Sequence, residues 1–359
     1  MAEANQDAVE SRVVFGSGDR NFSVRDVIDA AHFRGEVAAS WKNFLREIAV
    51  EEKADEAGQE ADDEAIDTAA ERFRYNHDLI TAEETEKWLA ERGLSLGDFS
   101  SYFVRRYWSE TAEDDGATDA ADYLAAPEDL RALFTMELTF SGELDGMAQR
   151  LSWRVAAKAA AKEEADAQIF AVAEANFRER QGLPESEEND WLGKLGRNEE
   201  WLRAQIAMEA IYHRACAALL SPEARAREIS ALRLPLTNFE VETLEFDSLD
   251  AAREGLLCVQ QDGMTMEEVA SEGRYPYRHT EVLLEDVPED LQQKFLSVTP
   301  GETLEPITHG EGFHLCRIIG KAEPNLEDPM VKERAEDRIL DRHFAELCSN
   351  HIQWRRVLP

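Results

Sequence analysis

The chain has 359 residues, of which 43% are hydrophobic and 32% are charged, and its formal net charge is −36. Nucleic acids and anionic membranes require basic patches on a partner, so this charge argues against both as ligands. The N-terminus lacks the basic and apolar regions of a secretory signal, and the four cysteines form no CxxC pair. We therefore expect a cytoplasmic protein of two or three domains with reduced thiols.

The first two thirds of the chain contain a degenerate duplication. The segment Phe33-Arg-Gly-Glu-Val37 recurs as Phe140-Ser-Gly-Glu-Leu144. Leu79–Gly93 and Leu183–Gly196 also correspond, since each carries a pair of glutamates, a Trp-Leu pair and a closing glycine. A period of about 100 residues is too long for a solenoid repeat, so the duplication predicts two copies of one helical module.

Both copies have apolar residues at spacings of three and four, which is typical of helices. Thr81 and Glu84 form a predicted capping box, and Gly93 is placed to end the helix that this box begins. Ser95 and Asp98 are a plausible cap for the next helix. The predicted helices are Val24–Phe33, Val37–Glu52, Ile66–Arg74, Ala82–Arg92 and Leu96–Tyr107, then Leu130–Phe140, Leu144–Ala161, Gln168–Arg180, Ser186–Leu195 and Glu199–Leu220.

Strand and turn signals appear only after the second copy. This region predicts a small antiparallel sheet. Its signals are those of a strand, two helices, a short helix and a hairpin with a turn at His309–Gly312. In chain order these elements are Phe239–Phe246, Leu249–Gln261, Thr265–Ser271, Pro288–Ser297, Thr303–Thr308 and Phe313–Ile319.

The C-terminal region predicts one more helix. Asn325–Pro329 breaks the chain, and Met330–Trp354 is amphipathic. Within it, Cys348 and His351 have a spacing that a metal could use, but two ligands are too few for a structural zinc site. We expect no metal and no cofactor.

The sheet region resembles a known family. The ordered residues Pro300-Gly-Glu302, Pro306-Ile307 and Gly312-Phe-His-Leu315 resemble the C-terminal half of a parvulin-type (PpiC) peptidyl-prolyl isomerase domain. The Phe-Arg, Trp-Leu and Gly pattern of the helical copies resembles the N-terminal module of SurA-like isomerases.

This resemblance implies an α+β fold. It consists of a mainly helical body of two tandem modules, a parvulin-like sheet domain and a last helix that packs on the body. The expected parts are an N-terminal segment (1–23), two helical modules (24–125 and 126–235), the parvulin-like domain (236–324) and the C-terminal helix (325–359).

The resemblance also implies a pocket for an X-Pro segment. Its expected lining is Thr243, Val287, Leu291, Phe313 and His314. An active parvulin has two facing histidines and an Asp or Cys nearby. His314 falls on one histidine position, but the other falls near Thr243, where the sequence has no histidine, and the segment 272–278 has neither Asp nor Cys.

We interpret the chain as a peptide-binding chaperone or accessory protein with a degenerate parvulin-like domain. Its expected partner is a peptide or unfolded polypeptide, such as a precursor peptide in the maturation of a ribosomal-peptide natural product, or a maturation enzyme. One alternative is an active peptidyl-prolyl isomerase that uses His314 as its catalytic residue. A second alternative is a scaffold for a partner enzyme.

Overall fold

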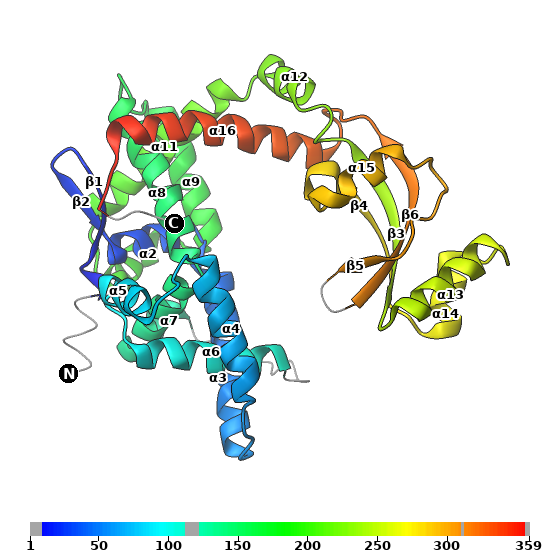
Figure 1. Ribbon diagram of the computed structural model, residues 1–359. Coiled ribbons are helices and arrows are strands. Elements are labelled where there is room, and N and C mark those ends of the chain that lie inside the picture. The colour runs from blue at the N-terminus through cyan, green and yellow to red at the C-terminus, as the bar shows by residue number, and fades with distance from the viewer. Residues whose placement is uncertain (1–8, 112–121, 310–311, 356–359) are drawn as a thin grey trace. The chain divides into compact units, whose positions relative to one another are not determined.

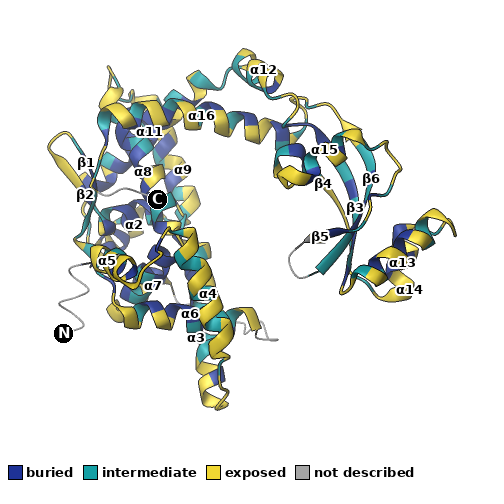
Figure 2. Cartoon of the chain, viewed as in Figure 1, coloured by how far each residue is buried: buried dark blue, intermediate teal, exposed yellow. Residues whose placement is uncertain are grey.

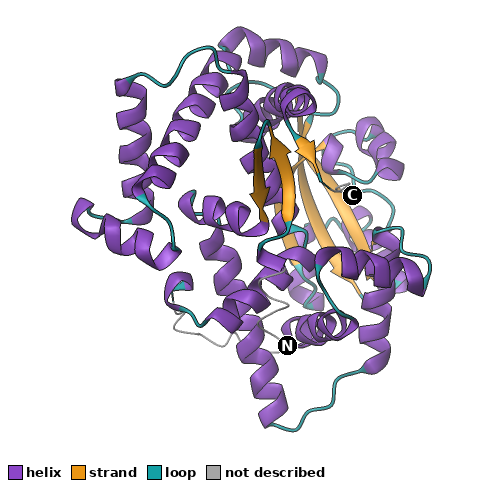
Figure 3. Ribbon diagram, turned by 90° about the vertical axis from the view of Figure 1, so that its left-hand side faces the viewer, coloured by secondary structure: helices purple, strands orange, loops and turns teal. Residues whose placement is uncertain are grey.

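The computed structural model describes residues 9–111, 122–309 and 312–355, and helices make up most of it (Figure 3). The chain divides into two compact units. The helical unit contains the chain up to Ala217 and again from Arg342, and the sheet unit is Ala218–Asp341. The predicted α+β class, a helical body with a small antiparallel sheet, is confirmed.

The helices of the helical unit follow the predicted order (Figure 1). Two of them, α2 and α5, have the predicted bounds, whereas α3, α4 and α6 extend beyond their predicted ends. The set is α2 (Val24–Phe33), α3 (Val37–Glu56), α4 (Asp63–Asn76), α5 (Ala82–Arg92), α6 (Leu96–Thr111), α7 (Glu128–Phe140), α8 (Glu143–Ala160), α9 (Ala167–Gln181), α10 (Glu188–Leu195) and α11 (Glu199–Leu219).

Local signals account for several helix ends. The Thr81 side chain accepts from the backbone of Glu84, whose carboxylate accepts from the backbone of Thr81, so the capping box is present. The corners between α2 and α3 and between α7 and α8 turn at Gly35 (φ 73°) and Gly142 (φ 80°). Other residues adopt this left-handed conformation only at a cost, so the repeated glycine is explained by the repeated corner.

The two copies share one core. The Phe33 ring at the end of α2 stacks on Phe177 of α9, with the ring centroids 4.8 Å apart. Trp41 of α3 meets Phe134 of α7 edge to face at 5.1 Å. Helices α4–α6 enclose a second cluster, which also takes in Phe140 from α7. Buried residues therefore line the inner sides of helices from both copies (Figure 2).

A small sheet at the ends of the chain is absent from the sequence prediction. β1 (Val13–Ser17) pairs with β2 (Arg20–Ser23) on one side and with β7 (Gln353–Trp354) on the other. The predicted C-terminal helix is therefore too long: α16 (Pro329–His351) ends three residues before Trp354. The chain leaves the helix there because Trp354 packs against Phe15, with their rings 5.2 Å apart.

Helix α16 supplies core residues to each unit. In the helical unit, Phe344 stacks on Trp153 at 5.3 Å and lies 5.0 Å from the ring of Tyr212. In the sheet unit, Val331 and Ala335 are fully buried in a cluster that includes Leu236 and Leu283.

The sheet unit contains one four-stranded antiparallel sheet of order β4-β3-β6-β5. In Figure 1, α15 lies beside one end of the sheet and α13 and α14 lie beside the other. The elements are α12 (Pro222–Ala231), β3 (Asn238–Phe246), α13 (Leu249–Gln260), α14 (Met266–Gly273), β4 (Tyr277–Leu283), α15 (Glu289–Ser297), β5 (Ile307–His309) and β6 (Gly312–Ala322).

The predicted strands need two corrections. Strand β4 was not predicted, because its residues 278–281 are all exposed and show no apolar alternation. The strand predicted at Thr303–Thr308 is shorter, since only Ile307 onward pairs continuously and Thr303 forms an isolated bridge with Arg317. Pro306 has no backbone N–H to donate to a ladder. Residues 310–311 of the predicted turn lie outside the described residues.

Candidate functional site

The two faces of the β3–β6 pair carry different side chains. Successive residues of a strand point to opposite faces, and the register pairs Thr243 with Cys316 and Leu244 with Leu315. Leu244 and Leu315 are fully buried against α13 and α14. Cys316 belongs to the cluster beneath α15 on the other face. The face that carries Thr243 is the one on which the sequence places a pocket.

Helix α15 covers one half of that face. Its Leu291 and Phe295 pack in a cluster with Phe239 and Val241 of β3 and Ile318 of β6. The ring centroids of Phe239 and Phe295 are 5.5 Å apart. This half of the face is closed by apolar side chains and serves as core.

The other half of the face, which we call the shelf, carries polar side chains. It consists of Thr243 and Glu245 on β3, His314 on β6 and Arg278 on β4. The register pairs Glu245 with His314 and Thr243 with Arg278, so these four side chains lie in two adjacent rows. Arg278 is exposed and the other three are half-buried.

A buried thiol lies at the boundary between shelf and core. Cys316 is 9% exposed, and its side chain is hydrogen-bonded to that of Thr243. Burial raises the pKa of the Cys316 thiol above its usual value, an effect that the Thr243 hydroxyl only partly offsets. A thiol in this state is a poor nucleophile at neutral pH.

The structure separates the five residues predicted to line the pocket. Thr243 and His314 lie together on the shelf, but Val287 and Leu291 are 5% and 8% exposed and pack in the α15 core. Phe313 lies on the opposite face, among the residues that pack against α13 and α14. The five residues therefore do not line one open groove. Val287 and Leu291 fill the core, and Phe313 lies on the other face of the sheet.

Sequence reasoning missed Glu245 and Arg278. The period of two along β3 is the signal that could have found Glu245, because it places residue 245 on the same face as residue 243. Arg278 could not be found in this way, because strand β4 was itself unpredicted.

The reverse face has its own polar group, centred on Glu242. The Tyr277 hydroxyl donates to Oε1 of Glu242 at 2.8 Å, and Arg317 Nη1 lies 3.9 Å from Oε2. Burial and this hydrogen bond raise the pKa of Tyr277 to about 12. These side chains pair with one another across three strands, so we assign them to the stability of the sheet.

The described residues offer neither a cluster of metal ligands nor a membrane-spanning helix. No three His, Cys, Asp or Glu side chains gather there as metal ligands would. Cys348 instead lies 3.4 Å from the Ser152 hydroxyl and is buried. Of the described helices, none combines the length and apolarity of a membrane span.

Comparison with known proteins gives distant structural similarity only. No family model matches the chain, and no curated protein matches it. Solved structures do match. The peptidylprolyl isomerase PrsA from Bacillus cereus is 13% identical, with 60% of this chain and 85% of that chain covered and a TM-score of 0.36.

Two further structures are of the same kind. The foldase PrsA from Lactococcus lactis is 9% identical, with 96% of each chain covered and a TM-score of 0.29. A SurA-like chaperone from Campylobacter jejuni is 8% identical, with 60% of this chain and 89% of that chain covered and a TM-score of 0.20. Similarity this distant says nothing of activity or ligand.

Proposed function

We propose that the chain is a peptide-binding chaperone or accessory protein whose sheet unit holds extended polypeptide segments without isomerising prolyl bonds. The observation that carries the proposal is the shelf together with the strand that borders it. Strand β4 lies at the edge of the sheet, and its residues 278–281 are exposed. An extended segment can lie over the shelf, where its side chains reach Thr243, Glu245 and His314, and one end of it can add its backbone to the edge of β4.

The lack of isomerisation follows from what the shelf contains. Rotation about a peptide bond crosses a barrier of roughly 18–20 kcal/mol, and a catalyst must hold the twisted bond in a shaped, desolvated site. Here Thr243 takes the place of a facing histidine, and its side chain is hydrogen-bonded to that of Cys316. The apolar walls that would shape the pocket, Val287 and Leu291, are closed into the core. Thr243 and His314 are proposed as peptide contacts, not as catalysts.

For the biological setting we propose a cytoplasmic accessory role in which the client is a precursor peptide of a ribosomal-peptide natural product. The thiols Cys216, Cys258, Cys316 and Cys348 are all free, which suits a reducing compartment. The acidic chain would keep such a complex soluble.

Two measurements test the proposal on the full chain. Calorimetry with a permanently unfolded, carboxymethylated protein should give binding that weakens at least severalfold in His314→Ala and Glu245→Lys. The matched control is His351→Ala, in the last turn of α16. Exchange spectroscopy on an alanyl-prolyl peptide should give the spontaneous rate.

The rivals predict other results. Acceleration of prolyl exchange that is lost in His314→Ala would establish the active isomerase and overturn the proposal. Absence of any binding to unfolded chains, with capture of a specific enzyme encoded nearby, would establish the scaffold.

A further inference from the structure

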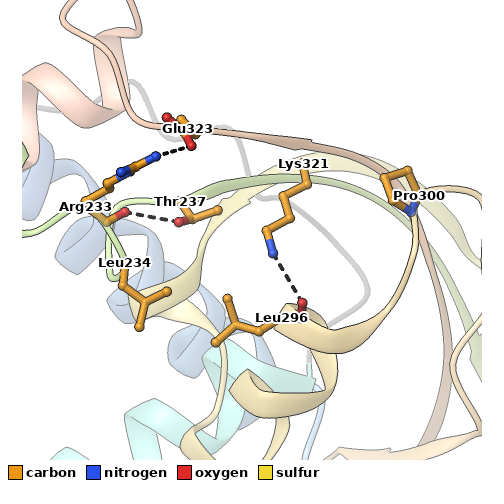
Figure 4. A pocket seen from close by; sticks show the side chains of 7 residues that line it. All are labelled: Arg233, Leu234, Thr237, Leu296, Pro300, Lys321 and Glu323. Atoms are coloured by element: carbon orange, nitrogen blue, oxygen red, sulfur yellow. Dashed lines mark hydrogen bonds and ion pairs between the residues drawn. The ribbon is translucent and has the colours of Figure 1, made fainter.

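A cavity at the far end of the sheet unit is separate from the shelf. It has a volume of about 540 Å³, which is within the range of ligand sites. Its apolar lining comes from Leu234, Leu296 and Pro300 (Figure 4). Lys321, also in the lining, is seven residues after His314 on β6, so at about 3.3 Å per residue the cavity lies roughly 20 Å from the shelf.

Polar contacts hold the walls of this cavity in place. Arg233 pairs with Glu323 across its rim, and the Thr237 hydroxyl donates to the Arg233 carbonyl at 3.1 Å. Nζ of Lys321 donates to the Leu296 carbonyl at 3.2 Å and lies 5.5 Å from the centroid of the Phe239 ring. The lining is therefore fixed by contacts between β6, the end of α15 and the segment before β3.

The charge of the cavity differs from that of the chain. Of the described residues that line it, Glu323 is the only acidic one, and it is already paired with Arg233. Among the described residues, Lys321 has a carbonyl and a ring as partners but forms no ion pair. In a chain of net charge −36, an exposed ammonium beside an apolar hollow favours a ligand that supplies a carboxylate next to an apolar group.

A second hollow continues the first. Its volume is about 290 Å³, it shares Arg233 with the larger cavity, and Ile229 and Leu326 are among its lining residues. Leu234 and Leu326 are 56% and 38% exposed, which is unusual for large apolar side chains. Two hollows that share one arginine suit an extended segment, because side chains at alternate positions of such a segment project to the same side and each hollow can take one of them.

We propose that these paired cavities bind an internal, extended polypeptide segment in which an acidic residue has an apolar residue two positions away on each side, so that all three side chains face the protein. The carboxylate pairs with Lys321, one apolar side chain fills the larger cavity, and the other lies in the hollow beside Leu326.

The probe is a nine-residue peptide, acetylated and amidated, with Leu-Gly-Glu-Gly-Leu in a Gly/Ser background, which places the two Leu and the Glu on one side of an extended segment. It has no proline, so its binding is independent of prolyl recognition at the shelf. Fluorescence anisotropy on the full chain should give saturable binding. Replacing the Glu of the peptide by Gln should weaken binding about tenfold, which corresponds to 1.4 kcal/mol, and higher salt should weaken it further.

Variants of the chain complete the test. Lys321→Glu should lose the Glu peptide and gain the matching peptide with Lys in place of Glu. Leu234→Asp should weaken binding of the Glu peptide. Because Leu234 is exposed, we expect Leu234→Asp to fold even if Lys321→Glu does not. Lys294→Gln, an exposed lysine of α15 outside the lining, is the matched control.

The proposal is overturned by equal binding of the Glu and Lys peptides, or by unchanged affinity in a folded Lys321→Glu or Leu234→Asp variant. Much tighter binding of the same peptide with a free C-terminus would also overturn it, because the site would then recognise chain ends.

Discussion

Arg105 of α6 donates from Nη2 to Oε2 of Glu137 on α7 at 3.2 Å, and the two side chains are only 4% and 11% exposed. The pair links the cluster of α4–α6 to α7. Burial, with a smaller contribution from Glu47, raises the pKa of Glu137 to about 7 despite the nearby guanidinium.

This pKa predicts a pH-dependent stability. Between pH 4.5 and 7 the folded protein keeps a proton on Glu137 that the unfolded chain has lost. The stabilisation from the neutral carboxyl is therefore complete below pH 4.5 and is lost as the pH rises through 7. Because Glu137→Gln cannot titrate, the free energy of unfolding of this variant should rise relative to the parent by up to about 3 kcal/mol across that window. Urea unfolding of the parent and of Glu137→Gln at pH 4.5, 5.5, 6.5 and 7.5 measures this difference in free energy. A difference that is constant with pH would contradict the prediction.

The α15 core gives a prediction about the residues first expected to bind peptide. Leu291→Ala should lower the free energy of unfolding of the sheet unit by about 2–4 kcal/mol, because the residue is 8% exposed and its removal leaves a cavity. The control is Leu257→Ala on α13. Because Leu257 is 48% exposed, this variant should change the free energy of unfolding by less than about 0.5 kcal/mol. Equal effects from both variants would mean that Leu291 is not part of the core.

Helix α16 gives a prediction about the helical unit. Phe344→Ala removes the ring between Trp153 and Tyr212 and should cost about 3–5 kcal/mol. Asp337→Ala, on the exposed side of the same helix, is the control. Tryptophan fluorescence during denaturation reports the change, since Trp153 is a direct contact. A variant that melts with the parent would show that the C-terminal half of α16 contributes little to this unit.

Two glycines four residues apart should respond oppositely to alanine. Gly142 has φ 80°, so Gly142→Ala should destabilise by about 1 kcal/mol through backbone strain alone, because no atom of the described residues beyond its two chain neighbours lies within 4 Å of the new Cβ. Gly146 lies inside α8, and among the described residues beyond its own helix backbone its Cβ would approach the guanidinium of Arg150 at 3.4 Å, an ordinary contact distance. Gly146→Ala should therefore stabilise by about 0.5–1 kcal/mol. Thermal melts of the two variants suffice, and shifts of the same sign would refute the prediction.

The parts of the fold that the sequence predicts are those encoded locally. Helix α5 begins at a capping box and ends at a left-handed glycine, and both signals are within the segment itself. Strand β4 and the two-residue strand β7 lack such signals, because each is defined by a partner strand distant in sequence. The position of Phe313 could have been predicted, since it and His314 are neighbours on one strand and must point to opposite faces. The burial of Leu291 could not, because it depends on how α15 packs over the sheet.

Strand β7 also has a consequence for how the chain is made. It pairs with β1, which the ribosome produces well before β7, because β1 is Val13–Ser17 and β7 is Gln353–Trp354. The whole sheet unit is translated in between, so one edge of β1 lacks its native partner until β7 has been made. An exposed strand edge is a place where other chains pair and aggregate. During translation, the N-terminal hairpin is thus itself a polypeptide segment in need of temporary protection.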